Sequence, residues 1–316
     1  MKISVIIATH ARPASLARLL SSLASQLVRG QHELFIAENG TRSPTDIATV
    51  DIPLTHLHDP RAGKCHIQNR AIALAQGDVV AFLDDDLVAA PCYLAAVGHF
   101  FDDYPHFGAM KGRILPARDP LTIVGRMAPY LDLPIVDHGE KVVEVRGVIG
   151  ANMAFRASAL QKLKLTPTHV VVGDNYSTTV EALVPMIFDE RLGPGAAGHE
   201  EETELSRRLR NAGFHIGYAP EALVLHEVDP TRADRARFTR VARERGYCRT
   251  LHEDHSPKEV ALKIAISTFR LGLARAFHAS VARVAREERR LAVAQGMRAG
   301  LALAKQSNDP QHFRPR

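Results

Sequence analysis

The sequence predicts an α/β fold in which a mostly parallel β-sheet is flanked by helices. Short apolar runs alternate with amphipathic helical patterns through the first hundred residues, as expected for right-handed βαβ units. The apolar run at residues 79–83 is followed directly by Asp84, Asp85 and Asp86. A strand buried on both faces would therefore end in three carboxylates, at the sheet edge where such folds place ligands.

The individual elements follow from the apolar periodicity. Strands are expected at residues 3–8, 33–38, 54–58 and 79–83. Pro13 opens one helix, and residues 63–76 form a second. The inward positions are Leu16, Leu19, Leu20, Leu23 and Leu27 in the first helix, and Ile67, Ala71 and Leu74 in the second.

The middle of the chain is less regular. Residues 105–146 contain short strand-like pieces at 108–114 and 141–145, and residues 166–184 have no clear period. Order returns with a strand at 150–155, a helix at 201–211 closed by Gly213, and strands at 215–219 and 222–225. The expected domains are residues 1–230, with halves at about 1–104 and 105–230, and a helical extension at 231–316.

Composition places the chain among ordinary globular proteins. Its 316 residues are 46% hydrophobic and 24% charged, which is enough for a full core. The segment 257–316 holds twelve Lys and Arg against four Asp and Glu, a net charge of +8, while residues 1–256 sum to −3. This asymmetry favours an anionic surface near the C-terminal segment and argues against a nucleic-acid groove across the fold.

A cytoplasmic location is expected. Cys65, Cys92 and Cys248 are widely spaced and fit no metal-ligand pattern, so reduced thiols are the default. The apolar stretch Ile3 to Ala8 is too short for a secretory signal, and no run of eighteen apolar residues predicts a spanning helix.

The three consecutive aspartates favour a cation site. In an extended backbone Asp84 and Asp86 share one side while Asp85 points away, so two carboxylates would face a hard divalent metal, Mn²⁺ or Mg²⁺. The alternative is an acidic turn in which one Asp caps a helix near Pro91.

Ordered motifs run from residue 3 to about residue 230. They are Ser4–Thr9, Glu38–Gly40, Gly63–Lys64 with Asn69–Ala71, Gly77–Asp78 with Phe82–Asp86, Gly150–Arg156, Phe188–Glu190 and Gly198–Leu209. In this order they resemble a large family of inverting glycosyltransferases with the GT-A fold, usually called family 2. The resemblance implies a GT-A type, Rossmann-like sheet.

The resemblance assigns roles to particular residues. Asp86, Asp84 and His226 would hold the metal that bridges the diphosphate, with Asp84 nearer the ribose. Glu202, and after it Glu201, stand where the family has its general base, usually an Asp. The nucleotide-sugar site would comprise Ala8, Thr9, His10, Arg12, Glu38, Asn39, Lys64, Arg70, Asp84 and Asp85.

The implied reaction transfers a sugar from a nucleoside-diphosphate donor to a hydroxyl acceptor, with a lipid-linked glycan among the candidates, in cell-surface polysaccharide or glycolipid assembly. Two alternatives stay open. A nucleotidyltransferase would need a Gly-rich loop after the first strand, and residues 8–13 contain no Gly. A non-catalytic nucleotide-sugar-binding homologue is supported only by Glu in place of the usual Asp.

The C-terminal segment from Pro257 to Lys305 is expected to form one or two helices with an apolar stripe and basic surroundings. Such a stripe fits the anionic inner face of a membrane, the catalytic domain, or a second copy in a homodimer. Its members are Leu262, Ile266, Phe269, Leu273, Phe277, Val281 and Val284, with Lys263, Arg270, Arg275, Arg283 and Arg286 around them.

Overall fold

The computed structural model describes residues 1–41, 52–163, 165–172 and 180–306. The chain divides into two compact units, described here one at a time. Unit 1 comprises Met1–Ala117, Pro134–Ala196 and Glu201–Glu227, and unit 2 comprises Arg118–Leu133, Ala197–Glu200 and Val228–Arg316. The chain passes from unit 1 to unit 2 for the last time after Glu227, close to residue 230. Two short earlier segments also belong to unit 2.

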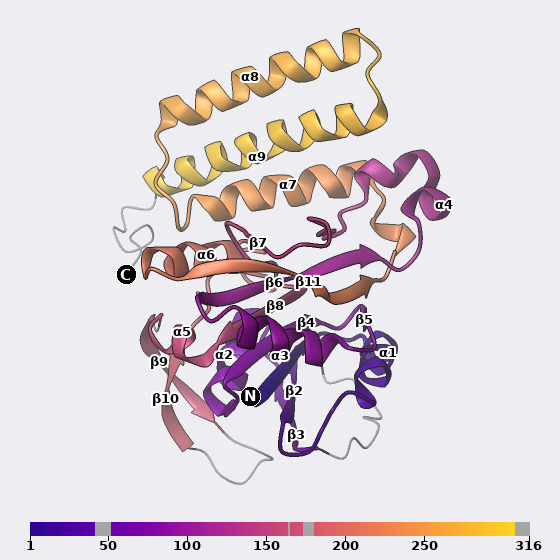
Figure 1. Cartoon of the computed structure of the whole chain (residues 1–316). Coiled ribbons are helices and arrows are strands. Elements are labelled where there is room, and N and C mark those ends of the chain that lie inside the picture. Colours follow the sequence, from indigo (N-terminus) through magenta and orange to yellow (C-terminus); the bar gives the residue numbers. More distant parts are fainter. Residues whose placement is uncertain (42–51, 164, 173–179, 307–316) are drawn as a thin grey trace. The chain divides into compact units, whose positions relative to one another are not determined.

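Unit 1 is built on a sheet of nine described strands (Figure 1). Their order is β3-β2-β1-β4-β8-β6-β11-β5, with β7 paired to β11. The strands are β1 (Ile3–Thr9), β2 (His32–Asn39), β3 (Leu54–Asp59), β4 (Val79–Asp84), β5 (Leu87–Ala89), β6 (Phe107–Pro116), β7 (Val143–Glu144), β8 (Asn152–Arg156) and β11 (His215–His226). Only β5, β7 and β8 run against the others, so the predicted mostly parallel sheet is confirmed.

Helices cover both faces of this sheet because its strands are apolar on both sides. Val5 and Ile7 of β1 face a core that includes α1 and α3, whereas Ile6 faces a second core with α2, α5 and α6. The helices are α1 (Pro13–Ala24), α2 (Lys64–Leu74), α3 (Tyr93–Asp103), α5 (Ala157–Gln161) and α6 (Glu201–Asn211). As predicted, Gly213 closes α6, with a φ of +83°.

Several details differ from the sequence expectations. Leu74 is 38% exposed because α2 ends there, and Leu27 lies beyond the end of α1. The segment predicted to be irregular contains two antiparallel strands, β9 (Leu165–Val172) and β10 (Val180–Met186). The two short strands predicted at 215–225 are one strand, β11, with a register shift between Ala219 and Leu223.

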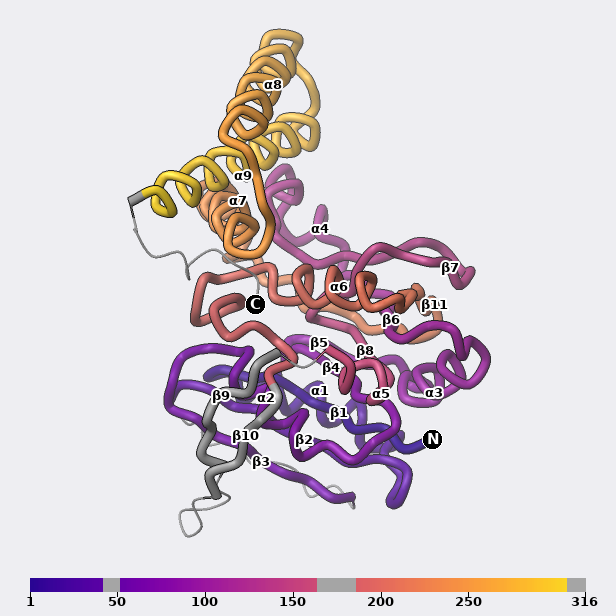
Figure 2. The backbone as a smooth tube through the Cα atoms, turned by 90° about the vertical axis from the view of Figure 1, so that its left-hand side faces the viewer, coloured from indigo at the N-terminus to yellow at the C-terminus, as the bar shows by residue number. Residues whose placement is uncertain are grey.

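Unit 2 is helical. It contains α4 (Pro120–Val124), η1 (Gly125–Tyr130), η2 (Pro230–Arg232), α7 (Arg235–Arg249), α8 (Pro257–Ala276) and α9 (Val281–Gln306). Within this unit α9 packs against both α7 and α8, as both views of the chain show (Figures 1 and 2). In the part of the chain that the structure covers, no helix is both long and apolar enough to cross a membrane.

A buried carboxylate joins the elements of unit 2. Glu288 of α9 accepts hydrogen bonds from Tyr130 (3.1 Å), Arg275 (2.8 Å) and Arg235 (2.9 Å). Burial alone would raise the pKa of Glu288, but the hydrogen bonds from the two arginines and Tyr130 lower it. The paired carboxylate therefore ties η1, α7 and α8 to α9.

Glycines allow α7 and α9 to approach closely. A Cβ atom at Gly246 would clash with the backbone of Val293, and one at Gly296 would clash with the backbone of Arg243. Backbone atoms cannot swing away as a flexible side chain can. The two helices therefore depend on hydrogen as the side chain at both positions.

We predict that Gly296→Ala lowers the free energy of unfolding by about 1–3 kcal/mol, because the added methyl group forces α7 and α9 apart. Gly272→Ala is the matched control, since the space around this α8 glycine is open. Alanine should there be neutral or stabilising by about 0.5–1 kcal/mol through helix propensity. Urea unfolding followed by circular dichroism compares the two variants, and equal effects would contradict the proposed close approach.

Candidate functional site

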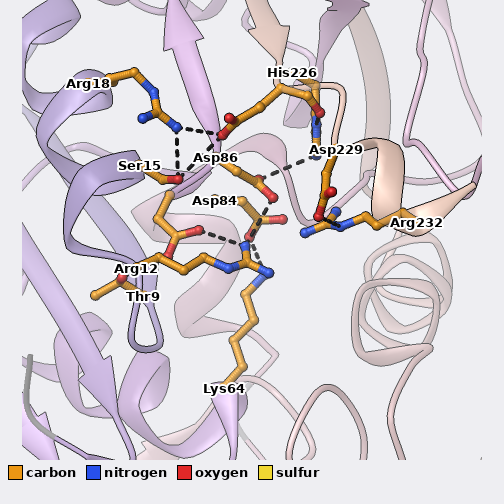
Figure 3. Close-up of polar contacts among 12 residues, drawn as sticks. Thr9, Arg12, Ser15, Arg18, Lys64, Asp84, Asp86, His226, Asp229 and Arg232 are labelled. Atoms are coloured by element: carbon orange, nitrogen blue, oxygen red, sulfur yellow. Dashed lines mark hydrogen bonds and ion pairs between the residues drawn. The ribbon is translucent and has the colours of Figure 1, made fainter. Parts of the chain in front are cut away.

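The three aspartates lie at the carboxyl end of β4, where the chain turns (Figure 3). Arg12 Nη1 donates to Asp85 Oδ1 and to Asp86 Oδ2, each at 3.0 Å. The expectation that Asp85 points away from Asp86 is therefore wrong. The strand ends at Asp84 and a turn begins at Asp85, so the alternation of an extended backbone does not reach Asp86.

Asp85 is held inside the protein. Its side chain is 4% exposed, and Thr9 Oγ1 donates to Asp85 Oδ2 at 2.7 Å. Burial raises the pKa of Asp85, and the hydrogen bond from Thr9 and the charge of Arg12 only partly offset this. Since Ala8 pairs with Asp84 in the parallel register, these contacts lock the end of β1 onto the end of β4.

Asp86 and His226 form a pair that fits a divalent metal. His226 Nδ1 lies 2.8 Å from the carbonyl oxygen of Glu227, which can only accept, so Nδ1 carries the proton in the neutral ring. His226 Nε2 lies 3.4 Å from Asp86 Oδ1. Metal-binding histidines commonly donate their other ring N–H to a carbonyl in this way.

Asp86 and His226 can supply one oxygen and one nitrogen ligand, so a metal there would need further ligands from outside this pair. Asp84 lies beside them, but its Oδ1 accepts a hydrogen bond from Lys64 Nζ at 2.5 Å. Among the residues that the structure describes, no group of three or more His, Cys, Asp or Glu side chains could by itself hold an ion.

Lys64 links the aspartates to a second acidic group, Glu201 and Glu202 at the start of α6. Burial alone would lower the pKa of Lys64, but the charges of Asp84, Glu201 and Glu202 raise it. Gly150 lies between the two sides. A Cβ atom there would be 3.4 Å from Lys64 Nζ and 3.8 Å from Glu202 Oε1. Lys64 and Glu202 therefore lie next to the same small space beside Gly150.

The two glutamates differ in their surroundings. Glu201 is 5% exposed, whereas Glu202 is half-buried. Burial raises the pKa of Glu201 well above its usual value, and the charge of Glu202 and a hydrogen bond between the two carboxyl groups act in the same direction. Glu201 therefore holds its proton to a higher pH than an exposed glutamate does.

The remaining predicted residues form a neighbouring group at the ends of β2 and β3. Glu38 Oε2 lies 2.9 Å from His56 Nε2, and His10 Nδ1 lies 2.8 Å from the carbonyl oxygen and 2.9 Å from the side-chain oxygen of Asn39. Arg70 does not reach the aspartates of β4. Its Nη1 donates to Asp59 Oδ2 at 3.3 Å.

Sequence reasoning missed Asp59 and Lys111. Asp59 accepts hydrogen bonds from Arg61 and Arg70. Burial alone would raise the pKa of Asp59, but Arg61 lowers it to about 2. The position of Asp59 at the end of the third predicted strand was a signal for it. Burial lowers the pKa of Lys111 against the charge of Glu202, which places this β6 lysine near the acidic pair.

We predict that Lys64→Met lowers the free energy of unfolding at pH 7. Burial alone would raise the pKa of Asp84, but the charge of Lys64 lowers it. The pair therefore stabilises the fold above the ordinary Asp pKa of about 4. That contribution is lost as the pH falls through the folded-state pKa. The Asp84 side chain is 30% exposed, so we expect about 1–3 kcal/mol, below the range for fully buried pairs.

Urea unfolding at pH 7 and at about pH 3 measures this difference, which should be smaller at the lower pH. Lys141→Met is the control, because Lys141 is an exposed lysine of unit 1. A difference from wild type that is independent of pH would show that Lys64 acts through packing alone.

Comparison with known proteins assigns the chain to a family. Residues 4–164 match the family model described as glycosyl transferase family 2. The chain is 27% identical over 204 residues to a glucosyl-dolichyl phosphate glucuronosyltransferase from Haloferax volcanii, covering 61% of this chain and 65% of that protein. It is 26% identical over 238 residues to a pre-mycofactocin glycosyltransferase from Mycobacterium tuberculosis, covering 71% and 42%.

The chain thus spans less than two thirds of the length of these relatives. Among solved structures, a mannosyltransferase from Pyrobaculum calidifontis in complex with GDP-Man and Mn²⁺ has a TM-score of 0.53 at 17% identity, over 98% of this chain and 77% of that one. S. aureus TarS has a TM-score of 0.50 at 16% identity, over 87% and 44%. These structures share the fold, and the matching model covers more than half of the sequence: the chain belongs to glycosyl transferase family 2.

Proposed function

We propose that this protein transfers a sugar from a nucleoside-diphosphate donor to a hydroxyl acceptor, with inversion at the anomeric carbon. One observation carries the proposal: Lys64 lies between Asp84, beside the Asp86–His226 pair, and the Glu201–Glu202 pair at the start of α6. A donor diphosphate at the first group and an acceptor hydroxyl at the second would meet at the same sheet edge. The named transferase relatives support this assignment.

The donor side would be formed by the ends of β1, β2 and β4. Asp86 and His226, with Asp84 beside them, would hold Mn²⁺ or Mg²⁺, and the bound metal would neutralise the charge of the leaving diphosphate. The Pyrobaculum mannosyltransferase, which shares the fold, is named with GDP-Man and Mn²⁺. Backbone at Ala8 to His10, with Arg12, Glu38, Asn39 and Arg70, would line the nucleotide pocket.

On the acceptor side Glu202 acts as the general base. Its carboxylate takes the proton of the acceptor hydroxyl while that oxygen forms a bond to the anomeric carbon, and the bond to the nucleoside diphosphate breaks on the opposite face. Glu201, whose pKa is raised by burial, would orient Glu202 through the hydrogen bond between the two carboxyl groups. Lys64 keeps the charges of both acidic groups partly compensated.

We further propose a role in cell-surface polysaccharide or glycolipid assembly at the cytoplasmic face of a membrane. The named activity of the Haloferax relative on a dolichyl phosphate supports a lipid-linked acceptor for this chain as well. The sugar and the base of the donor would be identified by a thermal-shift panel of nucleoside-diphosphate sugars with and without Mn²⁺. A ligand at a hundred times its Kd raises the unfolding free energy by about 2.7 kcal/mol.

Glu202→Gln should leave donor binding intact and lower kcat by roughly a hundredfold or more, because an amide cannot accept the hydroxyl proton. Donor affinity is measured by calorimetry and kcat by release of the nucleoside diphosphate. Glu201→Gln is the matched control, since a glutamine amide still donates a hydrogen bond to Glu202. If the Glu201 variant loses turnover and the Glu202 variant keeps it, the base has been assigned to the wrong glutamate.

Asp86→Asn should weaken binding of a nucleoside diphosphate in the presence of Mn²⁺ by about tenfold or more, because one of few hard ligands is lost. Titration calorimetry with and without metal gives the comparison. Asp78→Asn is the control, because Asp78 stands at the opposite end of β4 and accepts a hydrogen bond from the Lys2 backbone amide. Equal metal-dependent affinity in wild type and Asp86→Asn would move the metal to other residues.

A further inference from the structure

Helix α8 of unit 2 presents an apolar stripe on its outer face. Phe269 is 67% exposed and Phe277, just beyond the helix end, is 78% exposed. Leu262, Ile266 and Leu273 are also exposed and follow the same i, i+3, i+4, i+7 spacing. At 1.5 Å per residue the stripe extends over roughly 22 Å of helix length.

The stripe lies opposite the side of α8 that packs within unit 2. Val260, Ser267, Leu271 and Ala274 are the buried positions of the helix, and they occupy its other face. The stripe therefore lies outside the core of unit 2. It also ends with α8, because Val281 and Val284, predicted to continue it, belong to α9 after the turn at residues 277–280.

Positive charge accompanies the stripe. Lys258, Lys263 and Arg270 are exposed on α8, and Lys263 and Arg270, seven residues apart, form one flank of the apolar face. The only acidic residue in the helix sequence is Glu259, whose carboxylate lies 2.7 Å from Lys263 Nζ. The helix sequence therefore holds four Lys and Arg against one acid, a net charge of +3, although Glu259 pairs with Lys263 and Glu288 of α9 pairs with Arg275.

We propose that the outer face of α8 is a docking surface for a membrane containing anionic lipid. A helix lying flat in the interface would bury the phenylalanines and leucines at the acyl boundary and place its lysines and arginine among negative headgroups. Two copies joined through the same stripe with their helices antiparallel would instead place the Lys263–Arg270 flank of one copy against the same flank of the other. The charge pattern thus favours lipid over a second copy.

This inference rests on α8 itself, and vesicle binding needs neither donor nor turnover. Its connection to catalysis rests on the proposed function: a chain docked in this way could meet a lipid-linked acceptor at the surface. Loss of vesicle binding with transfer to a water-soluble acceptor retained would overturn only the docking. Loss of transfer with vesicle binding retained would overturn only the proposed reaction.

The test is sedimentation of the full chain with vesicles of phosphatidylcholine alone or mixed with phosphatidylglycerol. Wild type should bind the anionic vesicles more tightly, and its affinity should fall as salt is added. Phe269→Ser combined with Phe277→Ser should weaken binding by about tenfold or more. Leu121→Ser is the matched control, because Leu121 of α4 is 64% exposed in the same unit and lies off the stripe; it should bind as wild type does.

Folding and oligomeric state complete the test. Both changes are at exposed positions, so the unfolding midpoint of the double variant should match that of wild type. The docking proposal is overturned if wild type binds neither vesicle, if it binds neutral and anionic vesicles equally, or if the double variant binds unchanged. It is also overturned if the double variant melts much earlier, or if light scattering shows a wild-type dimer that it converts to monomer without any vesicle binding.

Discussion

The fold of unit 1 depends on how three adjacent carboxylates are tolerated at the end of a buried strand. Like charges this close repel strongly where water is scarce. Arg12 donates hydrogen bonds to Asp85 and Asp86, and Lys64 donates one to Asp84. Thr9 donates to Asp85. The cations come from the segment after β1 and from the first residue of α2, so pairing of β1 with β4 and docking of α2 position them together. The acid cluster is both the chemical site and a constraint on the fold.

Electrostatic interactions also link the three aspartates to the acidic pair at the start of α6. Lys64 is shared by Asp84 and the glutamates of α6, so its charge lowers the cost of placing both groups at one edge. Burial and the charge of Glu202 raise the pKa of Glu201, which favours the neutral form of this acid. Lys64 thus lies between two acidic groups that come from different elements, Asp84 at the end of β4 and the glutamates of α6. The proposed reaction uses the two groups separately, the first for the donor diphosphate and the second for the proton of the acceptor.

Local pattern predicted the parallel half of the sheet because β1, β2 and β4 are buried on both faces and α1 has one apolar face. Turns and long-range contacts were harder to predict. Alternation placed Asp85 on the wrong side because the sequence gives no sign that the strand stops at Asp84. Lys111 was missed because its proximity to Glu202 arises only when β6 and α6 come together. Leu74 was assigned inward because periodicity does not register the end of a helix.

The spacing of the apolar stripe on α8 fits two different roles. Its spacing resembles that of a core-facing helix, and the sequence left core, membrane and partner open. In the structure, the packing of unit 2 is satisfied without it: glycines at positions 246 and 296 bring α7 against α9, Glu288 ties α8 to α9, and the buried face of α8 carries other residues. The folding of this unit does not use Phe269 or Phe277, so their exposure needs another cause. Because lysines and an arginine surround them, a negatively charged membrane surface is the favoured partner.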